Sequence, residues 1–323
     1  MRNAGEEISR PAIARGADII RTGGVVAFPT ETVYGLGADA YNAEAVARIF
    51  EIKGRPRFDP LIVHICDIAS AESLAAEFPP QALLLAEKFW PGPLTLILRK
   101  RPVIPGIVTA GMPTVAIRMP SHPSALELIR LAGVPIAAPS ANPFGRISPT
   151  TAEHVREQLA DTVDFIINGG PCTVGVESTI VSLAGDKPVL LRPGGTPAEE
   201  IEKITGPLTV PERSEGPPES PGRLDSHYAP RTPLYLKADA RPLPKSARAG
   251  LLAFRTPEET EGFAAVEVLS KKGSLREAAA NLFAAMHRLD ALDLDVIIAD
   301  PPPEEGLGRA VNDRLRRAAR QSR

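Results

Sequence analysis

Two clusters of polar and charged residues near the start of the chain have the composition of a binding site for a small anion. Residues 29–37 supply two threonine hydroxyls, a carboxylate and a phenol directly after a short apolar stretch. Lys53 and Arg55 follow, two positions apart, at the end of the next predicted helix. Loops that follow strands often carry binding and catalytic residues, and both cations pair with phosphate or carboxylate. We therefore expect a polar pocket for a small anionic ligand.

Further hydrogen-bond donors stand at the ends of other predicted strands. Arg118 and Arg192 each close a strand, and Ser140 and Asn142 come just after a third one. Strand ends at one edge of an α/β sheet border a common crevice, so we expect these groups to lie close together. Cations and neutral donors in one pocket suit chemistry that depends on positioning and electrostatics, such as phosphoryl or nucleotidyl transfer.

One histidine lies inside an apolar predicted strand. Strand alternation places the side chain of His64 on the opposite face from Val63 and Ile65. A histidine in such a place is usually a core residue whose hydrogen bonds are satisfied. If its face lines the pocket near Thr32, it becomes a hydrogen-bond partner for a substrate, and the sequence leaves both interpretations open.

Several common catalytic signatures are missing from the sequence. No glycine-rich loop ends in Gly-Lys-Ser/Thr, and residues 35–40, which fit the dinucleotide-binding fingerprint, do not directly follow their strand. We find no Ser/His/Asp set that can be ordered and no His-Glu-x-x-His motif, so a covalent nucleophile is disfavoured. Cys66 and Cys172 have no metal-ligand spacing, and we expect neither a disulfide nor a metal held by side chains.

The elements that must position these groups form two predicted units. In the first, short apolar strands alternate with helical patterns and with direct strand-to-strand links, which favours an α/β sheet of mixed direction. A proline-rich stretch without apolar periodicity follows, as expected of a linker that crosses a surface. We predict a catalytic domain at 1–206, this linker at 207–232 and a small α/β domain at 233–323.

The composition is that of an ordinary globular protein. A net charge of −2 gives no general attraction to nucleic acid or to an anionic membrane. No apolar run approaches the roughly 18 residues that span a membrane, and the polar first residues do not form a signal peptide. We expect a soluble, cytoplasmic protein. The arginine cluster at 314–323 predicts either an RNA contact or a solvated helix end favoured by the helix dipole.

Seven segments, taken in order, resemble the YrdC-like family. Within that family, Ser226-His227-Tyr228-Ala229-Pro230 and the small second domain are similar to those of the two-domain threonylcarbamoyl-adenylate synthases. The resemblance covers nearly the whole chain and implies a twisted mixed sheet with flanking helices, followed by a small Rossmann-like domain. The seven segments are residues 29–37, Lys53-Gly54-Arg55, residues 61–64, Arg118-Met119-Pro120, residues 139–142, Ser148-Pro149-Thr150 and residues 177–180.

The resemblance implies a nucleotidyltransferase. In this family L-threonine, bicarbonate and ATP give threonylcarbamoyl-adenylate and pyrophosphate, and a tRNA threonylcarbamoyltransferase uses the adenylate to modify tRNA next to the anticodon. The amine of threonine and bicarbonate form a carbamate, whose oxygen attacks the α-phosphate of ATP. Mg²⁺ accompanies ATP, and no organic cofactor takes part. A direct contact with tRNA stays open.

The same resemblance implies which residues meet each substrate. For L-threonine they are Thr32, His64, Arg118, Ala138 and Ser178, with Arg118 on the carboxylate. For ATP they are Arg55, Asp59, Thr114, Ser140, Ser148, Arg192 and Tyr228. The catalytic set along the phosphates is Lys53, Arg55, Ser140 and Asn142. Tyr228 would fold over the site as a lid that keeps water from a labile adenylate.

One position departs from the family pattern. Members often have asparagine where this chain has Asp59. A carboxylate near ATP repels phosphate unless it meets Mg²⁺ or the ribose, so the role of Asp59 is open.

Two other functions are compatible with parts of the sequence. An RNA-binding protein would place tRNA or a double-stranded backbone in the cationic cleft, but the near-neutral charge and 5% aromatic residues count against it. A carbamoyl-transfer module would resemble the YrdC-like part of hydrogenase-maturation proteins. The acylphosphatase and zinc-finger regions that accompany that module are not visible in this sequence.

Overall fold

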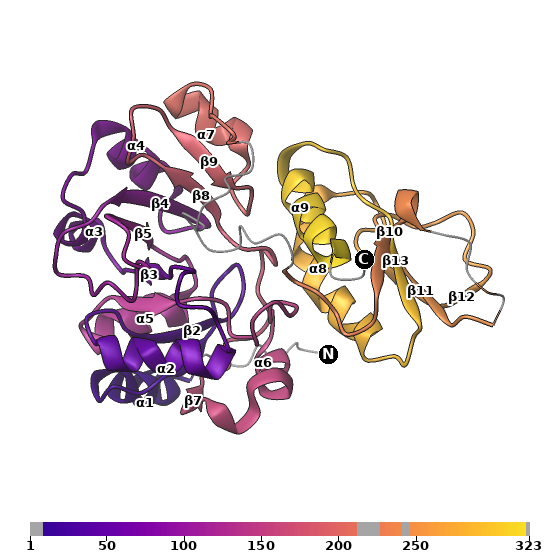
Figure 1. Ribbon diagram of the computed structural model, residues 1–323, viewed down its shortest axis with the longest axis horizontal. Coiled ribbons are helices and arrows are strands. Elements are labelled where there is room, and N and C mark those ends of the chain that lie inside the picture. Colours follow the sequence, from indigo (N-terminus) through magenta and orange to yellow (C-terminus); the bar gives the residue numbers. More distant parts are fainter. Residues whose placement is uncertain (1–8, 212–226, 241–243, 245, 321–323) are drawn as a thin grey trace.

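The computed structural model describes residues 9–211, 227–240, 244 and 246–320, which form two sheets with flanking helices (Figure 1). The first sheet has nine strands in the order β7-β1-β2-β6-β3-β5-β4-β8-β9 and mixes parallel with antiparallel pairs. The expectation of a mixed sheet is therefore confirmed. Its strands are β1 Val26–Phe28, β2 Gly35–Asp39, β3 Ile62–His64, β4 Leu94–Arg99, β5 Thr114–Arg118, β6 Ile136–Ala138, β7 Phe165–Ile166, β8 Thr179–Ser182 and β9 Val189–Arg192.

The helices of the first unit pack against the faces of its sheet. One sheet face packs on the largest apolar cluster, and the side of β1, β2 and β6 that carries Phe28 and Ile136 packs on α1 and α5. The cluster that continues this second face over β3, β4, β5, β8 and β9 contains no helix residue. The helices are α1 Arg10–Arg21, α2 Ala43–Lys53, α3 Ile68–Leu74, α4 Pro80–Phe89, α5 Pro123–Ala132, α6 Ala152–Leu159 and α7 Ala198–Thr205, with a short 3₁₀ turn at Ala160–Thr162.

The second unit is a parallel four-stranded sheet in the order β10-β13-β11-β12. Its helices α8 and α9 lie on the side of that sheet that faces the first unit (Figure 1). They therefore bring their side chains to the boundary between the units. The elements are β10 Leu234–Leu236, a 3₁₀ turn at Lys237–Asp239, β11 Ala249–Ala253, β12 Phe263–Val268, α8 Leu275–Asp290, β13 Val296–Ala299 and α9 Gly306–Arg320.

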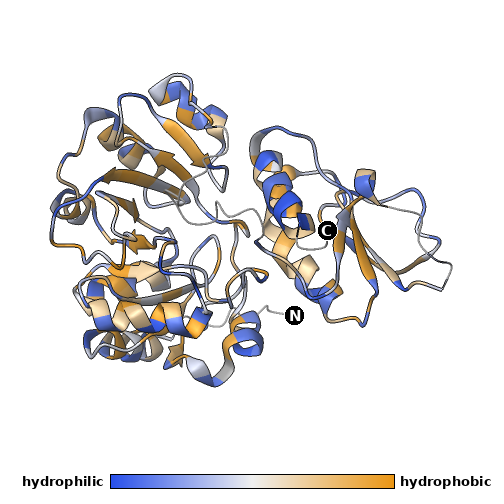
Figure 2. Ribbon diagram, viewed as in Figure 1, coloured by the Kyte–Doolittle hydropathy of each residue, from blue (hydrophilic) through white to orange (hydrophobic). Residues whose placement is uncertain are grey.

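Hydropathy follows this layering (Figure 2). Both sheets are built largely from apolar residues, and the helices alternate apolar and polar residues as amphipathic helices do. Among the described residues, no helix has the length and apolar character needed to cross a membrane.

The segment that follows β1 differs from its prediction. The sequence predicts a loop over residues 29–37, whereas Gly35 and Gly37 belong to β2 and pair antiparallel with β1. A Cβ on Gly37 would lie 2.6 Å from the Phe28 ring and 2.5 Å from Ile136. Glycine is therefore required here for close packing of neighbouring strands, and the connecting loop is shorter than expected.

Helix α2 sets the direction of the first pair of cations. The Asn42 side chain accepts hydrogen bonds from the backbone N–H groups of Glu44 and Ala45 and begins the helix. Gly54 ends it in the left-handed region, with φ of 58°. This reversal turns the chain between Lys53 and Arg55, so their side chains take different directions.

Candidate active site

Strand register gathers several predicted site residues on one face of the first sheet. His64 on β3 pairs with Arg118 on β5, and Arg192 on β9 pairs with Ile180 on β8. Ile180 also pairs with Thr95 on β4. Paired residues point to the same side of a sheet. These side chains therefore lie on the sheet face whose apolar cluster over β3, β4, β5, β8 and β9 contains no helix residue.

A narrow cavity of about 50 Å³ lies at this place, large enough for a few water molecules. Three arginines and the carboxylate of Glu177 line it, together with neutral donors and small apolar residues. Most of the predicted binding residues are therefore brought together. Those that line the cavity are Thr32, Arg55, His64, Arg118, Ala138, Ser140, Ser178, Arg192 and Tyr228.

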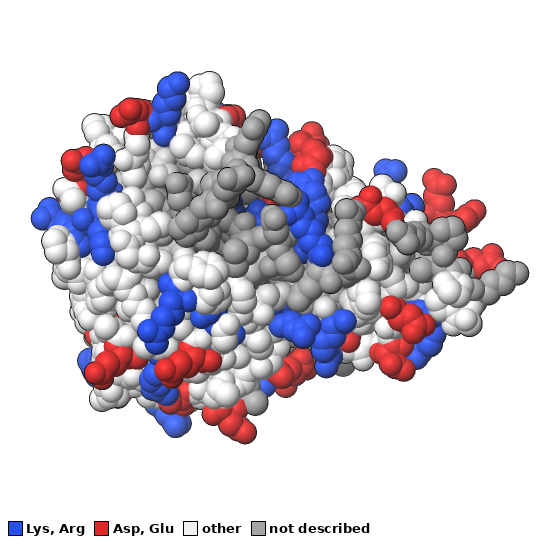
Figure 3. All heavy atoms as spheres, in the orientation of Figure 1, with Lys and Arg blue, Asp and Glu red and all other residues white. Residues whose placement is uncertain are grey.

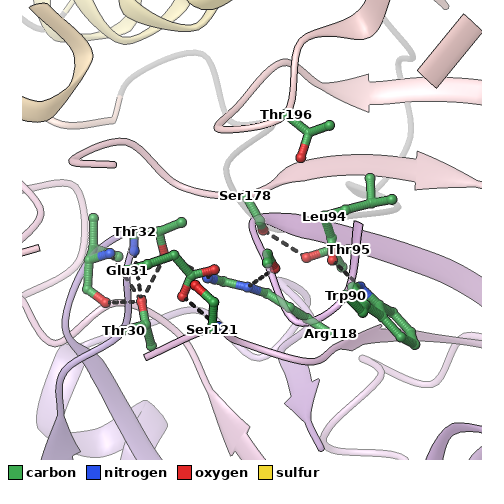
Figure 4. Close-up of polar contacts among 12 residues, drawn as sticks. Thr30, Glu31, Thr32, Trp90, Leu94, Thr95, Arg118, Ser121, Ser178 and Thr196 are labelled. Carbon is green, nitrogen blue, oxygen red and sulfur yellow. Dashed lines mark hydrogen bonds and ion pairs between the residues drawn. The ribbon is translucent and has the colours of Figure 1, made fainter. Parts of the chain in front are cut away.

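Arg118 is held in a fixed orientation by three groups (Figure 4). Its Nη1 donates to the Thr32 hydroxyl at 2.9 Å, its Nη2 lies 2.7 Å from a Glu31 carboxylate oxygen, and its Nε donates to the Gly92 carbonyl at 3.3 Å. Glu31 is itself held, because its other oxygen accepts from the backbone N–H of Ser121. The guanidinium is thus buried, paired and preoriented.

A second set of hydrogen bonds fixes Ser178 (Figure 4). Its hydroxyl lies 2.7 Å from that of Thr95, and Arg192 donates to both its hydroxyl and its carbonyl at 3.1 and 2.9 Å. Across the cavity, the Thr30 and Thr32 hydroxyls lie 2.8 Å apart. The cavity therefore offers hydroxyls whose directions are set by cations and by each other.

His64 faces the cavity as a neutral ring. Burial, and then the positive charge of Arg118, lowers its pKa to about 3. At neutral pH the imidazole therefore carries one N–H and one free lone pair. It can serve as a hydrogen-bond partner and cannot act as a cation.

Lys53 and Asn142 stand behind the cavity wall. The Lys53 amine donates to the carbonyls of Ser140 and Asn142 at 2.6 and 2.5 Å, and the Asn142 amide donates to Pro143 and Arg146. Burial lowers the pKa of Lys53 well below its usual value. These two predicted catalytic residues hold the 140–146 loop in place, and neither lines the cavity.

Asp59 is the ion-pair partner of Arg55. The two side chains are almost fully buried, with 2.9 Å between Arg55 Nη2 and an Asp59 oxygen. Arg55 also donates to the backbone carbonyls of Asp59 and Pro60. Burial raises the pKa of Asp59, and the charge of Arg55 opposes that effect. Arg55 therefore balances the charge of the Asp59 carboxylate, which does not require Mg²⁺ or a ribose as its partner.

Two other predicted contacts lie outside the cavity lining. Thr114 begins β5, at the opposite end of that strand from Arg118. Ser148 donates to a Glu177 oxygen at 2.6 Å and reaches the cavity only through that carboxylate.

The predicted lid residue closes one side of the cavity. Tyr228 is almost fully buried and has φ of 65°, which is rare for a residue with a side chain. Its ring lies 4.1 Å from that of His227, whose pKa is lowered well below its usual value by burial. Ser226, with which the motif begins, lies outside the described residues.

Three contributors were missed or misjudged from sequence. The sequence assigns no role to Glu177 or Glu31, because their partners lie far away in the chain. Arg314 was expected in a solvated helix end or an RNA contact, but its side chain is 0% exposed and pairs with Glu177. Its place between Val311 and Ala318 on the apolar face of α9 is the signal that was available. Arg323 lies outside the described residues.

The carboxylates near the cavity are engaged in ion pairs. The three carboxylates near it, Glu31, Asp59 and Glu177, each pair with an arginine. Among the residues that the structure describes, no group of three or more potential metal ligands is present. The chemistry that such a pocket supports is recognition of anions by buried, preoriented arginines and hydroxyls.

Comparisons with known proteins decide the family. A family model described as "Telomere recombination" matches residues 18–194, and one described as "Threonylcarbamoyl-AMP synthase, C-terminal domain" matches residues 196–320. The chain is 45% identical to the threonylcarbamoyl-AMP synthase of Pyrococcus abyssi, covering 98% of this chain and 96% of that protein. The chain belongs to the threonylcarbamoyl-AMP synthase family. The family's Bacillus subtilis member is 46% identical, covering 96% of this chain and 93% of that protein.

A solved structure extends the comparison to the fold. The Pyrococcus abyssi Sua5 protein, crystallised in complex with L-threonine, superposes with a TM-score of 0.90 at 42% sequence identity. The match covers 98% of this chain and 96% of that one, so the two proteins share both units and their arrangement. The chain is thus a nucleotidyltransferase of this family, and the RNA-binding alternative is not favoured.

Proposed function

We propose that this protein makes threonylcarbamoyl-AMP and pyrophosphate from L-threonine, bicarbonate and ATP. The observation that carries the proposal is the match over nearly the whole chain to two threonylcarbamoyl-AMP synthases, together with a pocket of the expected character. The product then passes to a tRNA threonylcarbamoyltransferase, and we place the protein in the cytoplasm, where ATP and tRNA are present. Residues 1–206, 207–232 and 233–323 are proposed as catalytic domain, linker and second domain.

The threonine end of the site is assigned to the Arg118 side of the cavity. The carboxylate of the substrate pairs with Arg118, whose guanidinium is already oriented by Glu31 and Thr32. Neutral His64 and the Ser178 hydroxyl offer hydrogen bonds to the amine and hydroxyl. Because these partners are fixed before binding, the carbamate formed at the amine is held in one position.

The nucleotide end is assigned to the other two arginines of the cavity. Arg55 and Arg192 provide positive charge beside the α-phosphate, and the Ser140 hydroxyl provides a neutral donor. Attack of the carbamate oxygen on the α-phosphate forms a P–O bond and expels pyrophosphate. These groups stabilise the negative charge that develops on the phosphoryl oxygens. Because they are buried, water screens their electrostatic interactions only weakly.

Mg²⁺ belongs to this proposal as a companion of ATP. The described residues offer no carboxylate cluster for it, so the side chains do not fit a protein-held ion. Mg²⁺ commonly reaches such sites on phosphate oxygens with few protein ligands. None of the steps above passes through the metal.

On one face of the molecule, the described residues carry side chains of both charges. Lys and Arg are interspersed with Asp and Glu across that face (Figure 3). Extended positive patches would be expected for a protein whose main partner is an RNA backbone.

The decisive experiment measures pyrophosphate release from ATP while threonine and bicarbonate are omitted in turn. We expect release only when both are present. Arg55→Ala and Ser140→Ala should slow it at least a hundredfold, because each removes a group beside the phosphates. Arg57→Ala is the matched control, since Arg57 lies two positions away and is exposed. Undiminished release without threonine would reject the proposed function.

A further inference from the structure

The second domain places a fully buried arginine at the edge of the active site. Arg314 on α9 has 0% side-chain exposure and makes two contacts with the first unit. Its Nε donates to a Glu177 oxygen at 2.9 Å, and its Nη1 donates to the Pro193 carbonyl at 2.6 Å. Its Nη1 also lies 3.0 Å from an oxygen of Asp313 on the same helix. Burying the whole guanidinium without its partners in the first unit would still be costly, so the placement depends on the two units lying together.

Glu177 explains why a cation is needed there. It is the one carboxylate among the residues that line the cavity in the described structure, and it is only 6% exposed. The Ser148 hydroxyl, its other partner, is neutral. An unpaired negative charge on the wall of the cavity would repel a polyphosphate and weaken its binding. Arg314 neutralises that charge from behind, without entering the lining itself.

The same arginine supports the lid residue. Its guanidinium carbon lies 5.4 Å from the centre of the Tyr228 ring, and Phe283 on α8 lies 5.5 Å from that ring. Tyr228 has a positive φ, a backbone conformation that persists only when its surroundings hold it. Two side chains of the second domain therefore hold Tyr228 against the cavity.

We propose that Arg314 is a positioning residue of the synthase site, through which the docked second domain neutralises Glu177 and holds Tyr228 in place for ATP. This inference rests on the proposed function, because it takes ATP as the ligand of that end of the cavity. It gives the second domain a direct share in the geometry of the site.

The test compares four variants of the full-length protein. Arg314→Met keeps side-chain length and removes the charge, and we expect the KM for ATP to rise at least tenfold while the KM for threonine stays within twofold. Arg314→Lys keeps the charge and loses the planar fork, so its KM for ATP should lie between those of the wild type and of Arg314→Met. Glu177→Gln combined with Arg314→Met should recover part of the loss, because the unpaired charge of Glu177 is then removed, while Asp313, the other carboxylate at Arg314, keeps its ion pair with Arg317.

Arg316→Ala serves as the matched control. Arg316 lies on the same helix, is half exposed and pairs with Glu304 inside the second domain. Its KM for ATP should equal that of the wild type. Thermal unfolding of each variant separates loss of ATP affinity from loss of fold. If Arg314→Met does not fold, Arg314→Lys carries the test, with a severalfold rise in the KM for ATP expected at an unchanged Tm.

Three results would overturn the inference. They are a KM for ATP within twofold of wild type in folded Arg314→Met (in Arg314→Lys, where Arg314→Met does not fold), an equal loss for both substrates, and no recovery in the double variant. Calorimetric titration with ATP keeps the inference separate from the proposed function. A wild type that binds ATP and makes no threonylcarbamoyl-AMP rejects the function alone, whereas a wild type that does not bind ATP rejects both.

Discussion

At the scale of single residues, the cavity is lined by arginines whose orientation is fixed by neighbouring side chains. Arg118 receives its orientation from Glu31, a residue that the sequence placed in the same polar run as Thr32 but without a role. Both side chains are buried, so solvent and salt screen their electrostatic attraction only weakly, and the ion pair keeps a fixed geometry. Tyr34 from the same run donates to the Gly170 carbonyl and accepts from the Gly169 N–H, as expected for loop packing.

We predict that Glu31→Gln raises the KM for threonine about tenfold, equivalent to about 1.4 kcal/mol of binding free energy. The amide cannot neutralise Arg118, so the guanidinium loses its fixed direction and its buried charge loses a partner. The KM for ATP should stay within twofold. Steady-state kinetics of pyrophosphate release measure both constants, with Glu153→Gln on the exposed side of α6 as the control. A lower KM for threonine would show instead that Glu31 competes with the substrate.

The residues that sequence could and could not find differ in one physical respect. His64 and Arg118 were found because strand alternation and strand ends are local patterns. Glu177 and Arg314 are separated by 137 positions, and no local pattern specifies that they meet. Motif resemblance supplied the roles of Lys53 and Asn142, yet only coordinates show that these side chains hold a loop behind the cavity wall.

At the scale of elements, the connection between Cys172 and Ser178 joins the substrate pocket to α8. The backbone N–H of Val174 donates to the Glu31 carbonyl, and Ser178 contributes its hydroxyl to the cavity. Between them, Gly175 lies against the helix. A Cβ on Gly175 would be 2.4 Å from the Ala279 carbonyl oxygen, and its φ is 75°. Glycine is therefore required at this position for two reasons: the backbone has a positive φ, and the loop lies too close to α8 for a side chain.

Gly175→Ala is predicted to lower the Tm by several degrees and to reduce activity, because α8 must move away from the loop that carries Glu177 and Ser178. Gly170→Ala is the matched control. Gly170 has a similar φ of 80°, but a Cβ there meets nothing within 4 Å. The backbone strain is thus the same, and the difference between the variants reports the contact with α8. Differential scanning fluorimetry and pyrophosphate release measure both effects, and equal losses in the two variants would contradict the contact argument.

The expected elements were largely right where apolar periodicity was long, and they failed where packing overrode local preference. The mixed sheet followed from the pattern of short apolar strands, helical stretches and direct strand-to-strand links. Strand β2 did not, because two glycines in five residues are unfavourable for a strand by propensity. They are accommodated because Phe28 fills the space above them.

At the scale of the whole molecule, the two units share a boundary made of specific polar contacts. Arg314 reaches Glu177, and Arg309 lies 3.3 Å from Glu199 on α7. Pattern alone predicted two units and a linker. It did not predict that helix α9 contacts a residue of the cavity wall, because docking of separate units depends on surface shape, which no periodicity encodes.

A histidine pair at the boundary makes the stability of the protein depend on pH. His154 on α6 and His287 on α8 stack with ring centres 3.9 Å apart. Burial lowers the pKa of His154 to about 4, with the charge of Arg288 adding to that effect. Burial and the neighbouring His154 lower the pKa of His287 to about 3, while Asp290 opposes and Arg231 adds to that effect. Both rings are therefore neutral while the units are docked.

The free energy of unfolding should consequently fall as the pH drops from about 6.5 toward 4. In the unfolded chain each histidine takes up a proton near pH 6.5, whereas the folded pair resists protonation, so acid favours the unfolded state. Each ring contributes a slope of at most about 1.4 kcal/mol per pH unit in that window and nothing above pH 7.5. Urea unfolding at pH 7.5, 6 and 5 measures this dependence. His287→Gln should reduce the pH dependence of the free energy of unfolding by the contribution of one histidine, because the other buried histidines contribute equally in both proteins. Parallel curves for the variant and the wild type would show that the pair does not resist protonation.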